Sequence, residues 1–240
     1  MTEVNWKGYA ESHTGHVRQM NQDAVLVSSE VGLWAVADGM GGHEAGDVAS
    51  QMIVDALAEV DDDQSLVDQV DAVEDTLIRV NESMRDFAQK NFERGVMGST
   101  IVLLLIRDRV GVVMWAGDSR CYRVRDGAIE QVTVDHRLVE DLLRKGEITE
   151  QEALNHPKRN AITRAVGAHE TLYLDWTFIE VQPYDSFMLC SDGLYSDVSD
   201  ADVLRIMRSG RPDTVAARLV GQGLQSSARD NLSAVVVYGS

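Results

Sequence analysis

Four short acidic segments, each at the edge of an apolar and strand-like run, constrain the fold of this chain more than any other feature. Each places an aspartate beside a small residue, and the four are Asp38-Gly39, Gly117-Asp118-Ser119, Ser191-Asp192-Gly193 and Asp230-Asn231. A carboxylate beside a buried strand costs free energy unless a partner offsets its charge. The small neighbours allow a sharp turn or a close approach of the backbone to a ligand. We therefore expect the fold to bring these aspartates to one sheet edge.

The ligand chemistry of such an edge follows from the residue types. No cluster of His or Cys accompanies the four aspartates, so the site would offer mainly oxygen ligands. Oxygen ligands suit hard divalent cations such as Mg²⁺ or Mn²⁺. The pattern predicts a polynuclear metal enzyme.

Two other motifs with Asp-Gly or Gly-rich segments do not fit. An EF-hand calcium loop needs oxygen ligands at its first, third and fifth positions. A loop starting at Asp38 has Met40 third and Gly42 fifth, and one starting at Asp192 has Leu194 third. A P-loop needs Gly-Lys-Ser/Thr after the glycines, and neither glycine cluster has it.

The composition limits the class of protein. The chain has 240 residues, of which 44% are hydrophobic and 25% charged, as in a soluble globular protein. Its net charge of −17 argues against a nucleic-acid partner, which would need a basic surface. No signal peptide and no apolar run of about 18 residues is visible, so we expect a cytoplasmic protein without a membrane partner. Cys121 and Cys190 stand in apolar runs and are interpreted as small core residues.

The hydrophobic periodicity predicts alternating groups of strands and helices. We expect strands at 4–11, 23–28, 32–37, 99–106, 110–115, 121–125, 128–132, 172–181, 186–190 and 234–238. We expect helices at 48–60, 66–87, 199–208 and 212–225, with a glycine-rich turn before the first of them. Asp126-Gly127 is a strong signal for a two-residue hairpin turn. A heptad-like stripe along 66–87 is compatible with a coiled-coil seam, but in one isolated helix it favours a core-facing stripe.

This order predicts an α+β fold, a four-layer α-β-β-α sandwich in which two mainly antiparallel sheets are flanked by helix pairs. No repeat or linker divides the chain, so we expect one domain over residues 1–240. Residues 136–160 break the pattern with crowded charges and short helical pieces. A polar excursion between two sheet regions is a candidate flap over a site.

Arg18 supplies a cation shortly before the strands that would build the site. Its guanidinium suits bidentate recognition of a phosphate. An isolated arginine is usually a surface residue, and only the context of Arg18 favours a functional role.

Eight segments of the chain together resemble the metal-dependent protein phosphatases, the PPM or type 2C family, and in particular its compact bacterial members. In order along the chain they are Val17-Arg18-x-x-Asn21-Gln22-Asp23, Ala37-Asp38-Gly39-Met40-Gly41-Gly42-His43, Gly98-Ser99-Thr100, Ala116-Gly117-Asp118-Ser119-Arg120, Asp135-His136, Ile162-Thr163-Arg164-Ala165-Val166-Gly167, Ser191-Asp192-Gly193-Leu194 and Asp230-Asn231-Leu232-Ser233. The resemblance spans 6–238.

The resemblance implies a role for each site residue. Asp38 would bridge two Mn²⁺ or Mg²⁺ ions, and the Gly39 carbonyl would bind the second. Asp192 and Asp230 would hold the first ion, and a third ion would lie between Asp118 and Asp192. Arg18 would bind the substrate phosphate.

Two positions depart from the eukaryotic pattern of the family. That pattern has Glu where this chain has Gln22, so Asp23 is the remaining acid that supports the site. It also has His where this chain has Met40. His43 is our candidate for the general acid, with an alternative role as a helix-terminal residue that hydrogen-bonds the loop. We expect His136 to be structural.

The function implied is hydrolysis of phosphoserine and phosphothreonine in protein substrates by a metal-activated water, reversing a eukaryotic-like Ser/Thr kinase in bacterial signalling. We expect a monomer. One alternative is an inactive relative that binds phosphoproteins, which the intact aspartates and Arg18 disfavour. Another is an enzyme whose substrate is a phosphorylated anti-sigma-factor antagonist.

Overall fold

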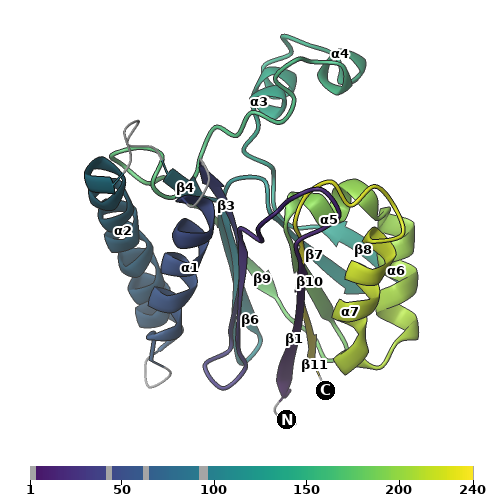
Figure 1. Cartoon of the computed structure of the whole chain (residues 1–240). Coiled ribbons are helices and arrows are strands. Elements are labelled where there is room, and N and C mark those ends of the chain that lie inside the picture. Colours follow the sequence, from purple (N-terminus) through teal and green to yellow (C-terminus); the bar gives the residue numbers. More distant parts are fainter. Residues whose placement is uncertain (1–3, 42–44, 62–64, 92–96, 240) are drawn as a thin grey trace.

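The computed structural model describes residues 4–41, 45–61, 65–91 and 97–239, and it contains two antiparallel sheets packed face to face (Figure 1). The five-stranded sheet has the order β1 (Trp6–His13), β11 (Leu232–Gly239), β10 (Ser186–Cys190), β7 (Arg120–Arg125) and β8 (Ala128–Gln131). The six-stranded sheet has the order β2 (Asp23–Ser28), β3 (Leu33–Gly41), β5 (Ile101–Arg107), β6 (Val110–Ala116) and β9 (Asp175–Glu180), with β4 (Met97–Ser99) paired to β3.

Helices cover the outer face of each sheet. The six-stranded sheet is covered by α1 (Ala45–Ala58) and α2 (Leu66–Asn91), and the five-stranded sheet by α6 (Asp200–Ser209) and α7 (Pro212–Gly223). The predicted four-layer α-β-β-α sandwich is therefore confirmed. Among the described helices, none is both long enough and apolar enough to span a bilayer.

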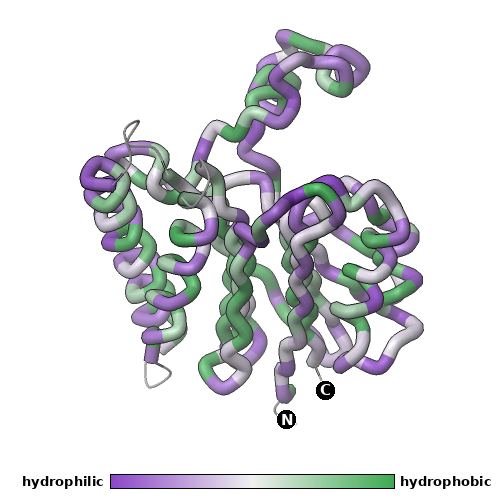
Figure 2. The backbone as a smooth tube through the Cα atoms, in the orientation of Figure 1, coloured by the Kyte–Doolittle hydropathy of each residue, from purple (hydrophilic) through white to green (hydrophobic). Residues whose placement is uncertain are grey.

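The core consists of one apolar layer between the sheets and one beneath each helix pair. Neighbouring residues of β3 show the division, because side chains alternate between the faces of a strand. Trp34 and Val36 pack between the sheets, whereas Leu33 and Ala35 face the helices. Burial on both faces explains the near-continuous apolar runs of the central strands (Figure 2).

The stripe along α2 faces the core, as the isolated-helix interpretation predicts. Val73, Leu77 and Met84 are fully buried against the six-stranded sheet and α1. Phe87, at the end of the stripe, is 37% exposed. The stripe is thus occupied within the domain.

The predicted glycine-rich turn after residue 37 is wrong in part, because β3 continues through Asp38 to Gly41. Gly39 to Gly41 pair with β4, and the predicted strand 99–106 is divided into β4 and β5 at Thr100. At this point the Thr100 amide donates to the Asp38 carbonyl at 2.8 Å, and the Asp38 amide donates to the Thr100 hydroxyl at 3.1 Å. The break in pairing therefore fixes the backbone on which Asp38 stands.

Other local predictions are largely confirmed. Asp126 and Gly127 have φ of +50° and +81° between β7 and β8, as a type I′ hairpin turn requires. Cys121 and Cys190 are buried and free. The short helix α5 (Asp192–Asp197) was not predicted, and β9 is shorter than its predicted range.

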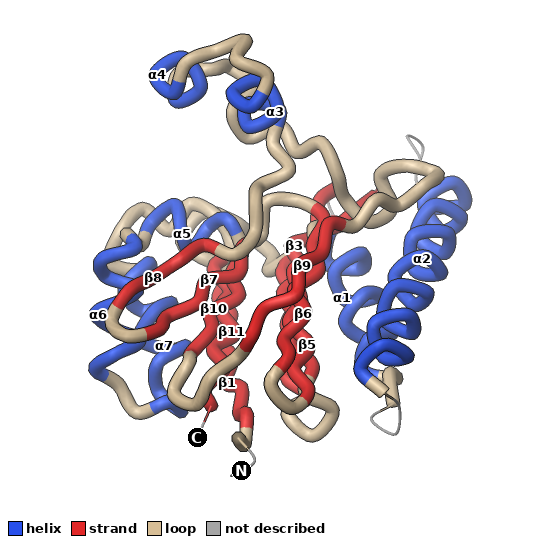
Figure 3. The backbone as a smooth tube through the Cα atoms, turned by 180° about the vertical axis from the view of Figure 1, so that it is seen from behind, coloured by secondary structure: helices blue, strands red, loops and turns tan. Residues whose placement is uncertain are grey.

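Residues 136–160 form an insert that projects from one end of the sandwich (Figure 3). It contains α3 (Leu138–Arg144) and α4 (Glu150–Leu154). At its neck Arg137 forms an antiparallel bridge with Ile162. The Leu138 amide donates to the Ala161 carbonyl at 2.9 Å, so the neck is a short paired segment rather than a loose loop.

The core-facing stripe on α2 predicts how truncation of its side chains changes the stability of the protein. Leu77→Ala should lower the free energy of unfolding by about 2–5 kcal/mol, because it leaves a cavity in a buried site. Ile78→Ala, on the neighbouring position that is 39% exposed, should cost less than about 1 kcal/mol. Urea denaturation at constant metal concentration measures both values, and equal losses would contradict the assignment of the buried face.

Candidate metal centre

The four predicted aspartates come from both sheets and meet at one end of the sandwich. Asp38 lies in β3, Asp118 follows β6, Asp192 begins α5 directly after β10, and Asp230 precedes β11. The charges of Asp192, Asp118 and Asp230 all act on Asp38. The fold therefore brings together the four segments that the sequence singled out.

Asp38 lies within this group of like charges. Burial raises its pKa well above the ordinary value, and the nearby carboxylates raise it further, Asp23 first among them. Asp23 stands directly opposite Asp38 in the pairing of β2 with β3. A negative charge at Asp38 is therefore disfavoured by its surroundings, and a bound cation would offset it.

Asp23 is held by two hydroxyl groups from the other sheet. Its Oδ2 accepts hydrogen bonds from Ser233 at 2.6 Å and from Ser191 at 2.7 Å. Burial raises the pKa of Asp23 to about 6, although both hydroxyls act in the opposite direction. Its Oδ1 is buried without a hydrogen-bond partner among the described residues. These bonds join the two sheets beside Asp38.

Asp118 is 2% exposed and pairs with Arg137, whose Nε donates to Asp118 Oδ2 at 2.7 Å. Burial raises the pKa of Asp118, and Arg137 opposes the rise. The Oδ1 of Asp118 is also buried and has no partner in the described part of the chain. One oxygen of this carboxylate is thus available to a further cation.

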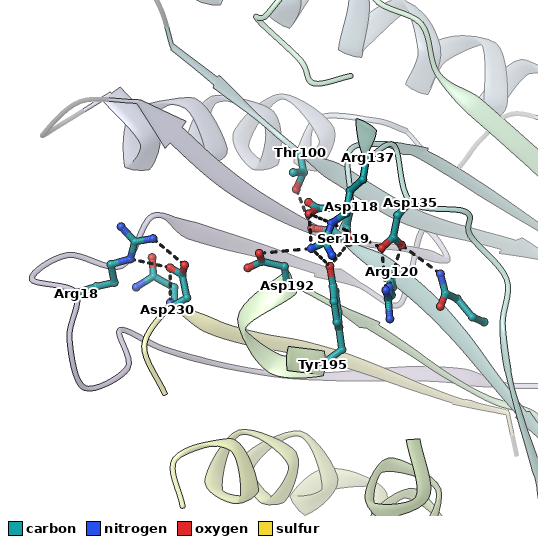
Figure 4. A network of polar contacts seen from close by, with 12 residues as sticks. Arg18, Thr100, Asp118, Ser119, Arg120, Asp135, Arg137, Asp192, Tyr195 and Asp230 are labelled. Carbon is teal, nitrogen blue, oxygen red and sulfur yellow. Dashed lines mark hydrogen bonds and ion pairs between the residues drawn. The ribbon is translucent and has the colours of Figure 1, made fainter. Parts of the chain in front are cut away.

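Asp192 is partly exposed, and burial followed by the charges of Asp118 and Asp230 raises its pKa to about 7. Arg137 Nη2 lies 3.8 Å from Asp192 Oδ2 and opposes that rise. Asp118 and Asp192 therefore share one guanidinium (Figure 4).

Asp230 is paired with Arg18, the predicted phosphate ligand. Arg18 Nε and Nη2 donate to the two carboxylate oxygens at 2.8 Å and 2.7 Å. The side chain of Arg18 is nevertheless 52% exposed. The Asn231 side chain accepts from the Gln22 amide at 2.9 Å and donates to the Thr14 carbonyl at 2.9 Å, which fastens the Arg18 loop beside Asp230.

Gly39 occupies a position that no other residue fits. A Cβ at Gly39 would collide with the Gly46 carbonyl oxygen and lie 2.7 Å from the Gln22 carbonyl oxygen. Coordination through the Gly39 carbonyl stays a prediction. His43, the candidate general acid, lies outside the described residues.

His136 is buried, with its Nδ1 accepting from the Gly117 amide at 3.1 Å and its Nε2 lying 3.2 Å from Asp175 Oδ2. Burial lowers its pKa. These contacts support the loop before Asp118 and agree with the predicted structural role.

The donor set fits a hard divalent cation. It consists mainly of carboxylate oxygens, and one of them, Asp118 Oδ1, is buried without a partner among the described residues. Within the described ranges, however, no three acidic, His or Cys side chains lie in an arrangement that holds one metal ion. Arg18 and Arg137 instead turn toward Asp230, Asp118 and Asp192, so these two guanidinium groups offset part of the acidic charge.

The sequence patterns did not single out Arg137 or Tyr195. Tyr195 donates to the Asp118 carbonyl at 2.9 Å and accepts from Arg137 Nη2 at 2.8 Å. The only available signal for Arg137 was its position directly after the Asp135-His136 motif. Tyr195 stands three residues after Asp192 and has no pattern of its own.

Comparisons with known proteins give a consistent result. Residues 11–222 match the family model described as Protein phosphatase 2C. The serine/threonine protein phosphatase PstP of Mycobacterium tuberculosis is 37% identical over 228 residues, which cover 95% of this chain and 44% of PstP. The chain therefore spans less than half the length of this curated relative.

Two solved structures are similar over nearly their whole length. PppA, described as a key regulatory component of T6SS in Pseudomonas aeruginosa, is 42% identical with a TM-score of 0.91, and the match covers 99% of each chain. The catalytic domain of the serine threonine protein phosphatase PstP, solved in complex with 2 manganese ions, is 35% identical with a TM-score of 0.82 and the same coverage.

Because the carboxylates of the site repel one another, we expect removal of one of these charges to stabilise the metal-free protein. Asp38→Asn should raise the melting temperature in EDTA by a few degrees, equivalent to about 1 kcal/mol, because it removes a buried charge from a like-charged group. It should also reduce the stabilisation by added Mn²⁺, which binds the folded state through this carboxylate.

Differential scanning calorimetry with and without Mn²⁺ measures both effects. Asp126→Asn, an exposed carboxyl in the β7–β8 turn, serves as the control and should change neither value. A lower melting temperature of Asp38→Asn in EDTA would contradict the proposed repulsion.

Proposed function

The chain belongs to the protein phosphatase 2C family, and we propose that it is a metal-dependent protein serine/threonine phosphatase. The observation that carries the proposal is the convergence of Asp38, Asp118, Asp192 and Asp230 from both sheets at one end of the sandwich. Arg18 lies beside them with its guanidinium more than half exposed. Such a site combines cation binding with phosphate recognition.

Each of the four aspartates has its own proposed role in binding the cations. Asp38 would hold both core ions, Mn²⁺ or Mg²⁺, and the Gly39 carbonyl would contribute to the second. Asp192 and Asp230 would hold the first, and Asp118 with Asp192 would hold a third. When bound, paired divalent cations lower the pKa of water and stabilise the charge that develops in phosphate ester hydrolysis. The manganese ions in the PstP structure support this assignment.

Asp23 supports the site without direct coordination. Hydrogen bonds donated by Ser191 and Ser233 hold one of its oxygens, and its residue is paired with Asp38 in the strand register. Because Gln22 is uncharged, Asp23 is the acidic residue of its segment that remains to support Asp38.

Arg18 binds the substrate phosphate through a bidentate pair of hydrogen bonds. Its present partner is Asp230, which is also a proposed cation ligand. Asp230 would therefore have to serve either Arg18 or a cation, since both would use the same oxygens. Arg18 would be free to bind phosphate when Asp230 holds a cation.

Substrates of this enzyme are phosphorylated proteins, and we assign it to signalling by a bacterial Ser/Thr kinase system as a cytoplasmic monomer. The insert at 136–160 stands at the same end of the sandwich as the aspartates, and it forms a flap that contacts the protein part of the substrate. Residues 1–240 act as a single phosphatase domain.

Hydrolysis of a phosphothreonine peptide should require Mn²⁺ or Mg²⁺ and stop with EDTA. Asp38→Ala should abolish turnover, since it removes the carboxylate shared by both core ions. Asp118→Ala should retain the two tight Mn²⁺ sites and lose activity mainly on protein substrates. Phosphate release assays and calorimetry measure these effects.

Full activity in metal-free buffer would exclude the proposed mechanism. Inertness with every divalent ion, together with retained phosphoprotein binding, would indicate an inactive binding relative instead. Loss of both tight Mn²⁺ sites in Asp118→Ala would show that this aspartate belongs to the core pair.

A second prediction tests His43 as the general acid. His43→Ala should lose about 10²–10⁴-fold in rate on a phosphoserine peptide but little on p-nitrophenyl phosphate, because nitrophenolate leaves without a proton. Arg18→Ala should weaken turnover of both substrates, mainly through binding. Comparing kcat and KM for the two substrates separates proton donation by His43 from phosphate binding by Arg18. If His43→Ala loses the same rate on both substrates, His43 only supports the loop.

A further inference from the structure

Arg137 joins the insert to the acidic end of the sandwich. It stands immediately before α3, and its backbone bridges Ile162 on the returning segment of the neck. Its side chain turns inward and is 15% exposed. The residue that begins the insert therefore has its charge inside the site (Figure 4).

The contacts of Arg137 are with proposed ligands of the third ion. Its Nε and Nη2 each lie 2.7 Å from Asp118 Oδ2, and Nη2 lies 3.8 Å from Asp192 Oδ2. Nη2 also donates to the Tyr195 hydroxyl at 2.8 Å. Arg137 thus supplies positive charge to the two carboxylates that would share that ion.

A second arginine, Arg120, pairs with Asp135, so the charge of Arg137 remains available to Asp118 and Asp192. Arg120 binds Asp135 through two hydrogen bonds of 2.9 Å and 2.8 Å. Its guanidinium carbon lies 3.7 Å from the centre of the Tyr195 ring. Arg137 approaches Asp135 only to 3.9 Å. Arg120 therefore neutralises Asp135 and supports Tyr195, which in turn orients Arg137.

We propose that Arg137 is an internal cation that competes with a divalent ion for Asp118 and Asp192, and that it couples binding of this ion to attachment of the insert. The inference rests on the proposed function for the identity of the ion. Both cations are attracted by the same buried carboxylates, and they repel each other at short range. Binding of one must therefore weaken binding of the other, and the effect is reciprocal.

The geometry allows the exchange without rebuilding the site. Asp118 Oδ2 faces Arg137, whereas Oδ1 is buried and has no partner among the described side chains. In the proposed exchange, an ion would bind Oδ1 while Arg137 moves away from Oδ2. Once Arg137 leaves, the neck retains its backbone bridge and the contacts of His136 with Gly117 and Asp175, but it loses the ion pair between Arg137 and Asp118. The insert then moves more freely.

Calorimetric titration with Mn²⁺ tests the competition. In Arg137→Gln the weakest Mn²⁺ binding event should tighten by about tenfold, the scale of a typical coupling between ligands, while the tighter events change little. Arg137→Lys keeps the charge and should stay near the wild-type affinity. Arg164→Gln is the matched control, because Arg164 pairs with Asp175 beside the same neck and, among the described residues, forms no ion pair with Asp118 or Asp192.

If the affinity of the weakest Mn²⁺ binding event is unchanged or lower in Arg137→Gln, the proposal is overturned. An equal gain in affinity in Arg164→Gln would overturn it as well. Phosphatase activity at saturating Mn²⁺ is measured on the same samples. If the wild-type protein is active and its tight Mn²⁺ sites are normal, but Arg137→Gln does not change the weakest Mn²⁺ binding event, only the competition by Arg137 is rejected. If the wild-type protein is inactive with every divalent ion, the proposed function is rejected.

Limited trypsin digestion of the wild-type protein gives an independent test that does not require a folded Arg137 variant. Raising Mn²⁺ through the range of the weakest event should increase cleavage after Lys145 and Lys158 in the insert several-fold, because the attachment through Arg137 is lost. The same rate of cleavage at all Mn²⁺ concentrations, or protection by Mn²⁺, would contradict the coupling.

Discussion

Mutual repulsion among buried carboxylates at one end of the sandwich is the constraint on which the rest of this structure depends. Burial raises the pKa values of Asp23, Asp38, Asp118 and Asp192. The charges of neighbouring aspartates raise those of Asp38 and Asp192 further. A fold can hold such a group only if the free energy gained elsewhere exceeds this cost. The apolar layers between the sheets and under both helix pairs supply that free energy, and positive charge offsets the rest.

That positive charge comes from two sources. Arg18 and Arg137 contribute guanidinium groups that pair with Asp230 and Asp118, and under the proposed function divalent ions bind the same carboxylates. Each arginine also has a second feature, since the side chain of Arg18 is half exposed and Arg137 begins the insert. The proposed exchange of arginine for metal would therefore link the charge balance of the site to phosphate recognition and to the insert.

The sequence predicted those parts that depend on local pattern. The bounds of β2 and β10 were predicted to the residue, from a run with partly alternating burial in β2 and a fully buried run in β10. The four Asp-small segments identified the carboxylates that converge. Pairing across the chain was harder to predict. The continuation of β3 past Asp38 depends on β4 and Thr100, more than 50 residues away. Arg137 and Tyr195 act through contacts between distant segments, which no spacing reveals.

The central claim is that these carboxylates hold divalent cations together with the arginines that balance them. Diffraction from crystals grown with Mn²⁺, measured at the manganese absorption edge, tests it most directly. We predict two strong anomalous peaks contacting Asp38, with Asp192 and Asp230 on one of them, and the Arg18 guanidinium turned away from Asp230. No peak among these carboxylates, or Arg18 still paired with Asp230 beside bound manganese, would contradict the account.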